Sequence, residues 1–315
     1  MMDFKTTLLA GAACLALVSL PAAATSSNVV ALVAARAAAE ARATPAVVAT
    51  DLPRMTAEQI VVRNAAARGG LAAWQRINSM SMSGKLDAGK VRKDGGAIAT
   101  SYASKLERAK GKAELRKALD NGTFEAKAEQ VIQLPFMMDL KRPSLQRLEV
   151  PFQAKTAVQV YDGKNGWKLR PFLGRHEVEP FTADELKMAA SQQQLDGALI
   201  NHQAKGTKVD LVGGEMVDGK GAYKLKLTLK NGEVRNTWVD AQTFLDVKIE
   251  GAPRHWDGKM RTVSTYFRDY KPVDGLMIAH RLETVVQGVL GSENIYVEKV
   301  ALNPVLDASR FTKPE

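Results

Sequence analysis

Apolar and polar positions alternate along most of the chain after residue 79, and this period of two predicts β-strands. In the two clearest segments the apolar positions are Leu225, Leu227 and Leu229, and Leu245, Val247 and Ile249. Further strands are expected at 145–150, 156–161, 166–170, 207–213, 234–239, 260–270, 276–286 and 293–302. Asp-Gly and Asn-Gly pairs, the strongest short-range hairpin signals, begin at 162, 165, 218, 231, 257 and 274. The pattern therefore predicts a long antiparallel meander.

Two capping boxes predict the starts of helices. The first spans Thr56 to Gln59, so a helix is expected to begin near Ala57. Gly69 and Gly70 supply a left-handed exit, and a second short helical stripe runs to residue 77. The second box, at 182–185, predicts a short amphipathic helix over 182–194.

These elements predict an α+β, mainly β fold. A single sheet of about ten twisted strands tends to curl, and its inner apolar face must be covered. The segments 57–77 and 182–194 are the helices available to cover it. The result is a curved antiparallel sheet with helices in its concavity. An apolar ligand could occupy that concavity, and a fully packed core fits the pattern equally well.

The first 24 residues have the features of an export signal. Lys5 precedes an apolar run at 8–20, and an A-x-A cleavage site follows at 22–24. Cleavage near Ala24 predicts a mature protein in the periplasm. Residues 11–14 offer a rival lipoprotein signal ending at Cys14, but cleavage there would leave an apolar core of only about six residues. Residues 25–54 are rich in Ala and are expected to form a flexible linker before a single domain over 55–315.

Charge is concentrated in one segment. The chain carries a net charge of +10, and residues 90–117 contain nine Lys or Arg against three Asp or Glu. We interpret a basic insertion at about 90–122 as a solvated excursion or as a docking surface for anionic lipid headgroups or an acidic partner at the inner-membrane face. Tyr102 is the only aromatic residue within 90–117. The stacking platform of single-strand nucleic-acid binders is therefore missing, and no nucleic-acid partner is expected.

Several stretches resemble one family. They are AAARGGLAAWQRINSMSMSGK at 65–85, QVYDGKNGWKLRP at 159–171, EPFTADEL at 179–186, GKGAYKLKLTLK at 219–230, and DYKPVDGLMIAH with YVEKVALNP within 269–304. Together they resemble the outer membrane lipoprotein-sorting proteins, the LolA-like periplasmic carriers, over roughly 55–311. The resemblance implies an open, half-closed β-barrel with an α-helical lid, whose apolar interior shelters acyl chains. It also implies an inner-membrane release complex and an outer-membrane acceptor as partners.

Candidate ligand-binding residues are the apolar positions of the sheet and one possible mouth. We expect Leu225, Leu227, Leu229, Leu245, Val247 and Ile249 on the sheet face, and Met137 with Met138 at the mouth, since thioether chains adapt to irregular ligands. The chain has one cysteine and no CxxC or HExxH motif, so no metal or other cofactor is expected. No G-x-S-x-G, S-x-x-K or paired-carboxylate motif is present, so no catalytic residue and no enzyme activity are expected.

Two functions follow from these observations. The favoured one is a periplasmic carrier or chaperone that buries the acyl chains of lipoproteins or other lipids for transport toward the outer membrane. The alternative is an envelope sensor of lipids or lipoproteins that regulates a membrane partner such as an anti-sigma factor.

Overall fold

The computed structural model describes residues 52–92, 129–171, 176–192, 195–256, 259–289 and 291–315. Contacts divide these residues into two units. Residues 87–92 and 129–133 belong to the first, in which Gln133 Nε2 donates to Asp87 Oδ1 at 3.2 Å. All other described residues belong to the second. The expected export segment lies outside the described residues, as do the linker up to residue 51 and the basic insertion from 93 onward.

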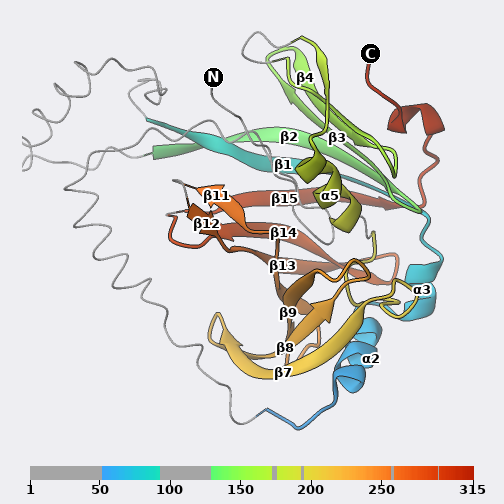
Figure 1. The fold of residues 1–315 in the computed structure, drawn as a ribbon, viewed down its shortest axis with the longest axis vertical. Helices are drawn as coiled ribbons and strands as arrows, with labels where there is room; N and C mark the ends of the chain where they lie inside the picture. The colour runs from blue at the N-terminus through green and yellow to red at the C-terminus, as the bar shows by residue number, and fades with distance from the viewer. Residues whose placement is uncertain (1–51, 93–128, 172–175, 193–194, 257–258, 290) are drawn as a thin grey trace, which may run out of the picture. The chain divides into compact units, whose positions relative to one another are not determined.

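Thirteen strands form one sheet, in the order β6-β5-β4-β3-β2-β1-β15-β14-β13-β10-β9-β8-β7 (Figure 1). Their bounds along the chain are β1 Ser79–Arg92, β2 Glu129–Lys141, β3 Leu145–Phe152, β4 Lys155–Tyr161, β5 Gly166–Leu169, β6 Val178–Pro180, β7 Lys208–Val217, β8 Lys220–Thr228, β9 Val234–Asp240, β10 Asp246–Glu250, β13 Val263–Val273, β14 Leu276–Val286 and β15 Glu293–Leu302. A separate hairpin pairs β11 Arg254–Trp256 with β12 Lys259–Arg261. The sheet is curved and does not close, because β6 and β7 are its two edges. The predicted fold class is confirmed.

Turn chemistry sets the register of the hairpins. Asp218 with Gly219, and Asp274 with Gly275, have positive φ at both positions, as a two-residue turn requires, and they join β7 to β8 and β13 to β14. The β13–β14 pairing then runs from Val273–Leu276 to Val263–Val286. On β14 every second residue is buried along the whole strand, so one face of the sheet is covered there.

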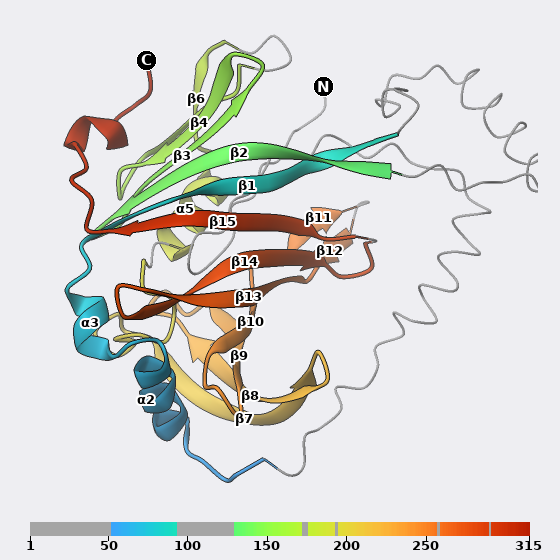
Figure 2. The same cartoon turned by 180° about the vertical axis from the view of Figure 1, so that it is seen from behind.

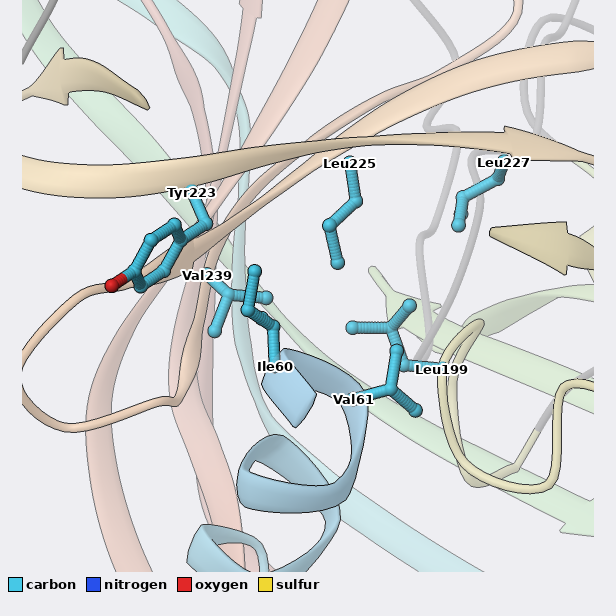
Figure 3. Close-up of a cluster of buried hydrophobic side chains, with 7 residues drawn as sticks. All are labelled: Ile60, Val61, Leu199, Tyr223, Leu225, Leu227 and Val239. Carbon is cyan, nitrogen blue, oxygen red and sulfur yellow. The ribbon is translucent and has the colours of Figure 1, made fainter. Parts of the chain in front are cut away.

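Helix α2 (Ala57–Ala67) packs on the sheet through Ile60 and Val61. Its predicted capping box is present: Thr56 Oγ1 accepts from the Gln59 amide, and Gln59 Oε1 accepts from the Thr56 amide. Figure 3 shows the two α2 side chains directed toward strands β8 and β9. We call these buried residues the α2 cluster: Ile60, Val61, Leu199, Tyr223, Leu225, Leu227 and Val239.

Helix α5 (Ala183–Gln192) is held against the strand that it faces by a buried ion pair. Lys168 Nζ on β5 lies 2.6 and 2.7 Å from the two carboxylate oxygens of Glu185. The Thr182 amide also donates to Glu185, and the Glu185 amide donates to Thr182 Oγ1, so the second predicted capping box is present. Tyr161, Phe181 and Ala189 form the apolar contact beside it.

The remaining short elements lie near the ends of the second unit. Helix α3 (Leu71–Gln75) follows α2, and the 3₁₀ helix η1 (Ala308–Phe311) ends the chain's ordered elements, as Figure 2 shows from behind. Arg310 fixes η1 to the sheet through Asp139, with Nε 2.8 Å from Oδ2. Phe311 is buried against Val158 and Val160 of β4.

Three local expectations differ from the structure. The single strand expected at 260–270 is divided at Thr262 into β12 and β13. Strand β8 ends at Thr228, so Leu229 lies beyond it. Strands β1, β2, β6 and β11 are not among the expected strands. In β2, Pro135 is exposed, and Phe136, Met138 and Asp139 are buried.

Candidate ligand-binding cavity

A cavity lies within the second unit, between the buried face of the sheet and the segments that cover it. Strands β1, β2, β9, β10, β13 and β14 line it, together with α3 and the turns at 195–198. Its apolar lining residues are Trp74, Met80, Met82, Leu140, Leu195, Ala198, Ile249, Phe267, Ile278, Ala279 and Leu282. The lining is therefore that of a site for an apolar ligand.

The cavity is partly open to solvent and encloses little space. Its unfilled space is about 650 Å³ with the mouth included, and the centres of water-sized molecules can occupy about 40 Å³ of it. A water needs about 10–15 Å³ by that measure, so the inner space holds about three waters. A long alkyl chain needs more room than the structure leaves.

Hydrogen bonds of Arg68 and a close backbone contact at Gly69 fix the main chain here, so the Arg68 side chain is positioned in the cavity. It caps α2, and its carbonyl accepts from Trp74 Nε1 at 2.9 Å and from the Met277 amide at 3.2 Å. Gly69 follows with φ of 105°, and a Cβ there would lie 2.4 Å from the Gly275 carbonyl oxygen. The close approach of this exit to the β13–β14 turn therefore requires glycine.

The Arg68 guanidinium forms the polar corner of the cavity. Nη1 donates to the Asp196 main-chain oxygen at 2.8 Å and lies 3.5 Å from Asp246 Oδ2. The guanidinium carbon is 4.6 Å from the centre of the Trp74 ring, within cation–π range. Tyr270 completes the corner by donating its hydroxyl to the Asp246 carbonyl at 3.0 Å.

Asp196 joins this corner to two further cations. Its Oδ2 lies 2.9 Å from Arg142 Nη2, and its Oδ1 lies 2.6 Å from Lys205 Nζ. Lys205 also donates to the Gly197 carbonyl at 2.7 Å. The turns at 195–198 are thus fixed to the β2–β3 connection and to their own continuation by charge-assisted hydrogen bonds.

Burial sets the pKa values in this network. Removal from water lowers the pKa of Lys205 to about 8, and the nearby charge of Asp196 limits the fall. Arg142 and Arg68 lower it further by repulsion. Burial also raises the pKa of the Tyr270 hydroxyl, so Tyr270 stays a neutral donor at physiological pH.

The predicted binding residues do not all meet at the cavity. Ile249 lines it, whereas Leu225 and Leu227 are fully buried in the α2 cluster. Leu229, Leu245 and Val247 are half-buried. Met138 is buried, and Met137 is 42% exposed. A ligand role for these eight residues remains a prediction.

A β-bulge explains why the residues of β10 do not face as simple alternation predicts. Simple alternation places Asp246 on the wet face opposite Ile249. The register of β10 against β9 shifts between Asp246 and Lys248, so that Asp246 pairs with Val239 and Lys248 with Trp238. Asp246 and Ile249 consequently both line the cavity.

Sequence reasoning also missed Arg68, Met80 and Met82 as lining residues. The alternation of Met with Ser at 80–83 is a strand signal that could have placed the two methionines on one face. Arg68 gives a weaker signal: a lone charge between three alanines and two glycines at a helix exit.

No cluster of three or more His, Cys, Asp or Glu side chains suited to a metal ion occurs within the described ranges. Among the helices that the structure describes, none is long and apolar enough to cross a membrane.

The fold and the cavity together define a protein with an open antiparallel sheet and a covered apolar site. No protein-family model and no curated protein matches the chain. Among solved structures it is similar to a LolA superfamily protein from Nitrosomonas europaea, at 13% identity and a TM-score of 0.48, covering 82% of this chain and 99% of that one. A DUF1329 family protein from Desulfovibrio piger is similar at 12% identity and 0.47, covering 81% and 97%.

A third similar structure is a domain from Vibrio parahaemolyticus that is described as outer membrane lipoprotein-sorting. Its identity is 12% and its TM-score 0.44, and the match covers 81% of this chain and 95% of that one.

Proposed function

We propose that the protein is a periplasmic carrier that holds alkyl chains of lipids or lipoproteins in the cavity during transport toward the outer membrane. The observation that carries the proposal is the apolar cavity on the buried face of an open sheet. Such a site binds by removing alkyl surface from water and needs no chemical step. The export segment at 8–20 and the family resemblance support the proposed compartment and direction.

The proposed partners are an inner-membrane release complex, an outer-membrane acceptor and an anionic membrane surface. The first two rest on the resemblance. The third rests on the charge of residues 90–117, which favours contact with anionic headgroups.

Entry of a chain requires one wall of the cavity to move outward. The turns that contribute Leu195, Gly197 and Ala198 are the part best suited to this. The backbone bonds within 199–207 are local, for example from the Lys205 amide to the Asn201 carbonyl. An outward movement of these turns would leave the sheet hydrogen bonds intact, but it would break the bonds of Asp196 to Arg68 and Arg142. Met80 and Met82 can adjust to a ligand on the opposite side.

The proposal is tested by titrating a fluorescent acyl probe into the purified mature protein. Burial of about ten methylenes at about 0.8 kcal/mol each gives about 8 kcal/mol, which corresponds to a micromolar Kd before ordering costs. Ala198→Phe adds a ring at a residue that lines the cavity, so it is expected to weaken binding at least tenfold. Val212→Phe, at a position that is 56% exposed on β7, is the matched control and should leave binding unchanged.

Thermal melts of both variants establish that they fold before the titrations are compared. A folded wild-type protein that takes up no acyl probe would refute the carrier function. Equal affinities of wild type, Ala198→Phe and Val212→Phe would show that the probe binds elsewhere.

A further inference from the structure

The cavity has a feature that a purely apolar site does not need, a buried arginine. Only Arg68 and Asp246 are charged among the residues that line it. The side chain of Arg68 is 6% exposed, so its charge is held almost entirely away from water. Burial of an arginine is unfavourable unless its charge and its N–H donors are satisfied.

The donors of Arg68 are incompletely satisfied by the described residues. Nη1 donates to the Asp196 carbonyl, but Nε is buried and has no hydrogen-bond partner there. The contact with Asp246 is long, at 3.5 Å from Nη1, and Trp74 offers the guanidinium only a ring face. A hydrogen-bond acceptor that reached Arg68 from the cavity would therefore pair with an N–H group that has already been removed from water.

The charges around this corner also do not balance. Three cations, Arg68, Arg142 and Lys205, face two carboxylates, Asp196 and Asp246. One further anion would neutralise the cluster, and Arg68 is the one of the three cations that lines the cavity.

We propose that the ligand is a single alkyl chain ending in a free carboxylate, and that Arg68 binds this carboxylate while the chain lies against Trp74, Phe267 and Leu282. The inference rests on the proposed function and narrows its substrate class. A carboxylate matches the planar guanidinium and carries the one missing negative charge. Ester- or amide-linked acyl chains lack that charge, so the geometry favours a free fatty acid over a protein-borne acyl group.

The test compares two probes of equal chain length, dodecanoate and dodecanol, by calorimetry at pH 7 below their aggregation concentrations. Wild-type protein is expected to bind dodecanoate at least tenfold more tightly than dodecanol. Arg68→Gln should remove this preference by weakening dodecanoate binding and leaving dodecanol binding unchanged. Arg63→Gln, an exposed arginine on α2 that stacks on Phe244, is the matched control and should keep the preference.

Asp246→Asn is a second variant, and its expected effect on dodecanoate affinity is opposite to that of Arg68→Gln. It removes the carboxylate nearest to Arg68, so dodecanoate affinity should rise several-fold while dodecanol affinity stays constant. This variant and the wild-type comparison decide the inference even if Arg68→Gln does not fold.

The possible failures are distinct. Equal binding of dodecanoate and dodecanol to wild type would overturn the carboxylate inference and leave the carrier function standing. Binding of neither probe would remove the proposed function itself. A preference for dodecanoate that persists in Arg68→Gln, or that does not increase in Asp246→Asn, would refute the role of Arg68.

Discussion

Two regions of one sheet differ in how their apolar face is covered. Over β8 and β9, side chains from α2 and from the turn at Leu199 pack against the sheet, and Leu225, Leu227 and Val239 are fully buried. Over β1, β13 and β14, the cover leaves a cavity with a charged corner. The strands present apolar residues in both regions. The shape and charge of the covering segments therefore decide whether a buried face of the sheet becomes core or binding site.

The largest expected effect comes from truncating a leucine in each region. Leu227→Ala should lower the free energy of unfolding by about 4 kcal/mol, because it leaves a void in a filled cluster. Leu282→Ala should cost about 2 kcal/mol, because Leu282 already borders empty space and has fewer contacts to lose. Urea unfolding with unchanged m-values measures both. Equal losses would break the distinction between the two regions.

A smaller effect is expected from the network that fixes the cover of the cavity. Asp196→Ala should lower the free energy of unfolding by about 3 kcal/mol, because it leaves Lys205 and Arg142 without their carboxylate. Asp210→Ala is the matched control. Asp210 also faces two lysines, but its side chain is 34% exposed, so its loss should cost at most about 1 kcal/mol. A loss at Asp196 no greater than that at Asp210 would contradict the role of this network.

The smallest effect concerns pH. The folded-state pKa of Lys205, about 8, lies below the ordinary value of 10.5, so the unfolded chain binds more protons between these values. Stability should therefore rise from pH 8 toward pH 10, by at most about 1.4 kcal/mol per pH unit. Above pH 10 the raised pKa of Tyr270 acts in the opposite direction.

Urea unfolding at pH 8.0, 8.7 and 9.4 measures the slope, and Lys205→Gln serves as the reference. The wild-type slope should exceed that of the variant. Identical slopes would mean that the lysine titrates as it does in water.

Local chemistry made much of the fold predictable. Thr56 and Thr182 signal their helices because capping satisfies amides within one turn of the same segment. The bounds of β14 follow from alternation on a sheet with one covered face, and the positive-φ turns follow from Asp-Gly. The turn at Gln153 and Ala154 has positive φ without glycine and carries no comparable signal.

The candidate site was less predictable, because it depends on contacts between distant residues. Arg142 and Asp196 are 54 positions apart, and their pairing requires the final packing of the turns on the sheet. Asp246 enters the cavity only because a bulge shifts the register of β10 by one residue. Alternation predicts that a face is buried, but it contains no information on the void that the cover leaves.

The most direct test of the account uses Trp74, which is 1% exposed and lines the cavity. A dodecanoate brominated along its chain quenches tryptophan fluorescence only at close range. Trp238 is buried against Lys224 and Lys248, on the other face of β9 from Val239, and provides the internal reference. We expect saturable quenching of the wild-type protein that is largely lost in a folded Trp74→Phe variant. Absence of quenching, or equal quenching in the variant, would contradict a ligand in this cavity.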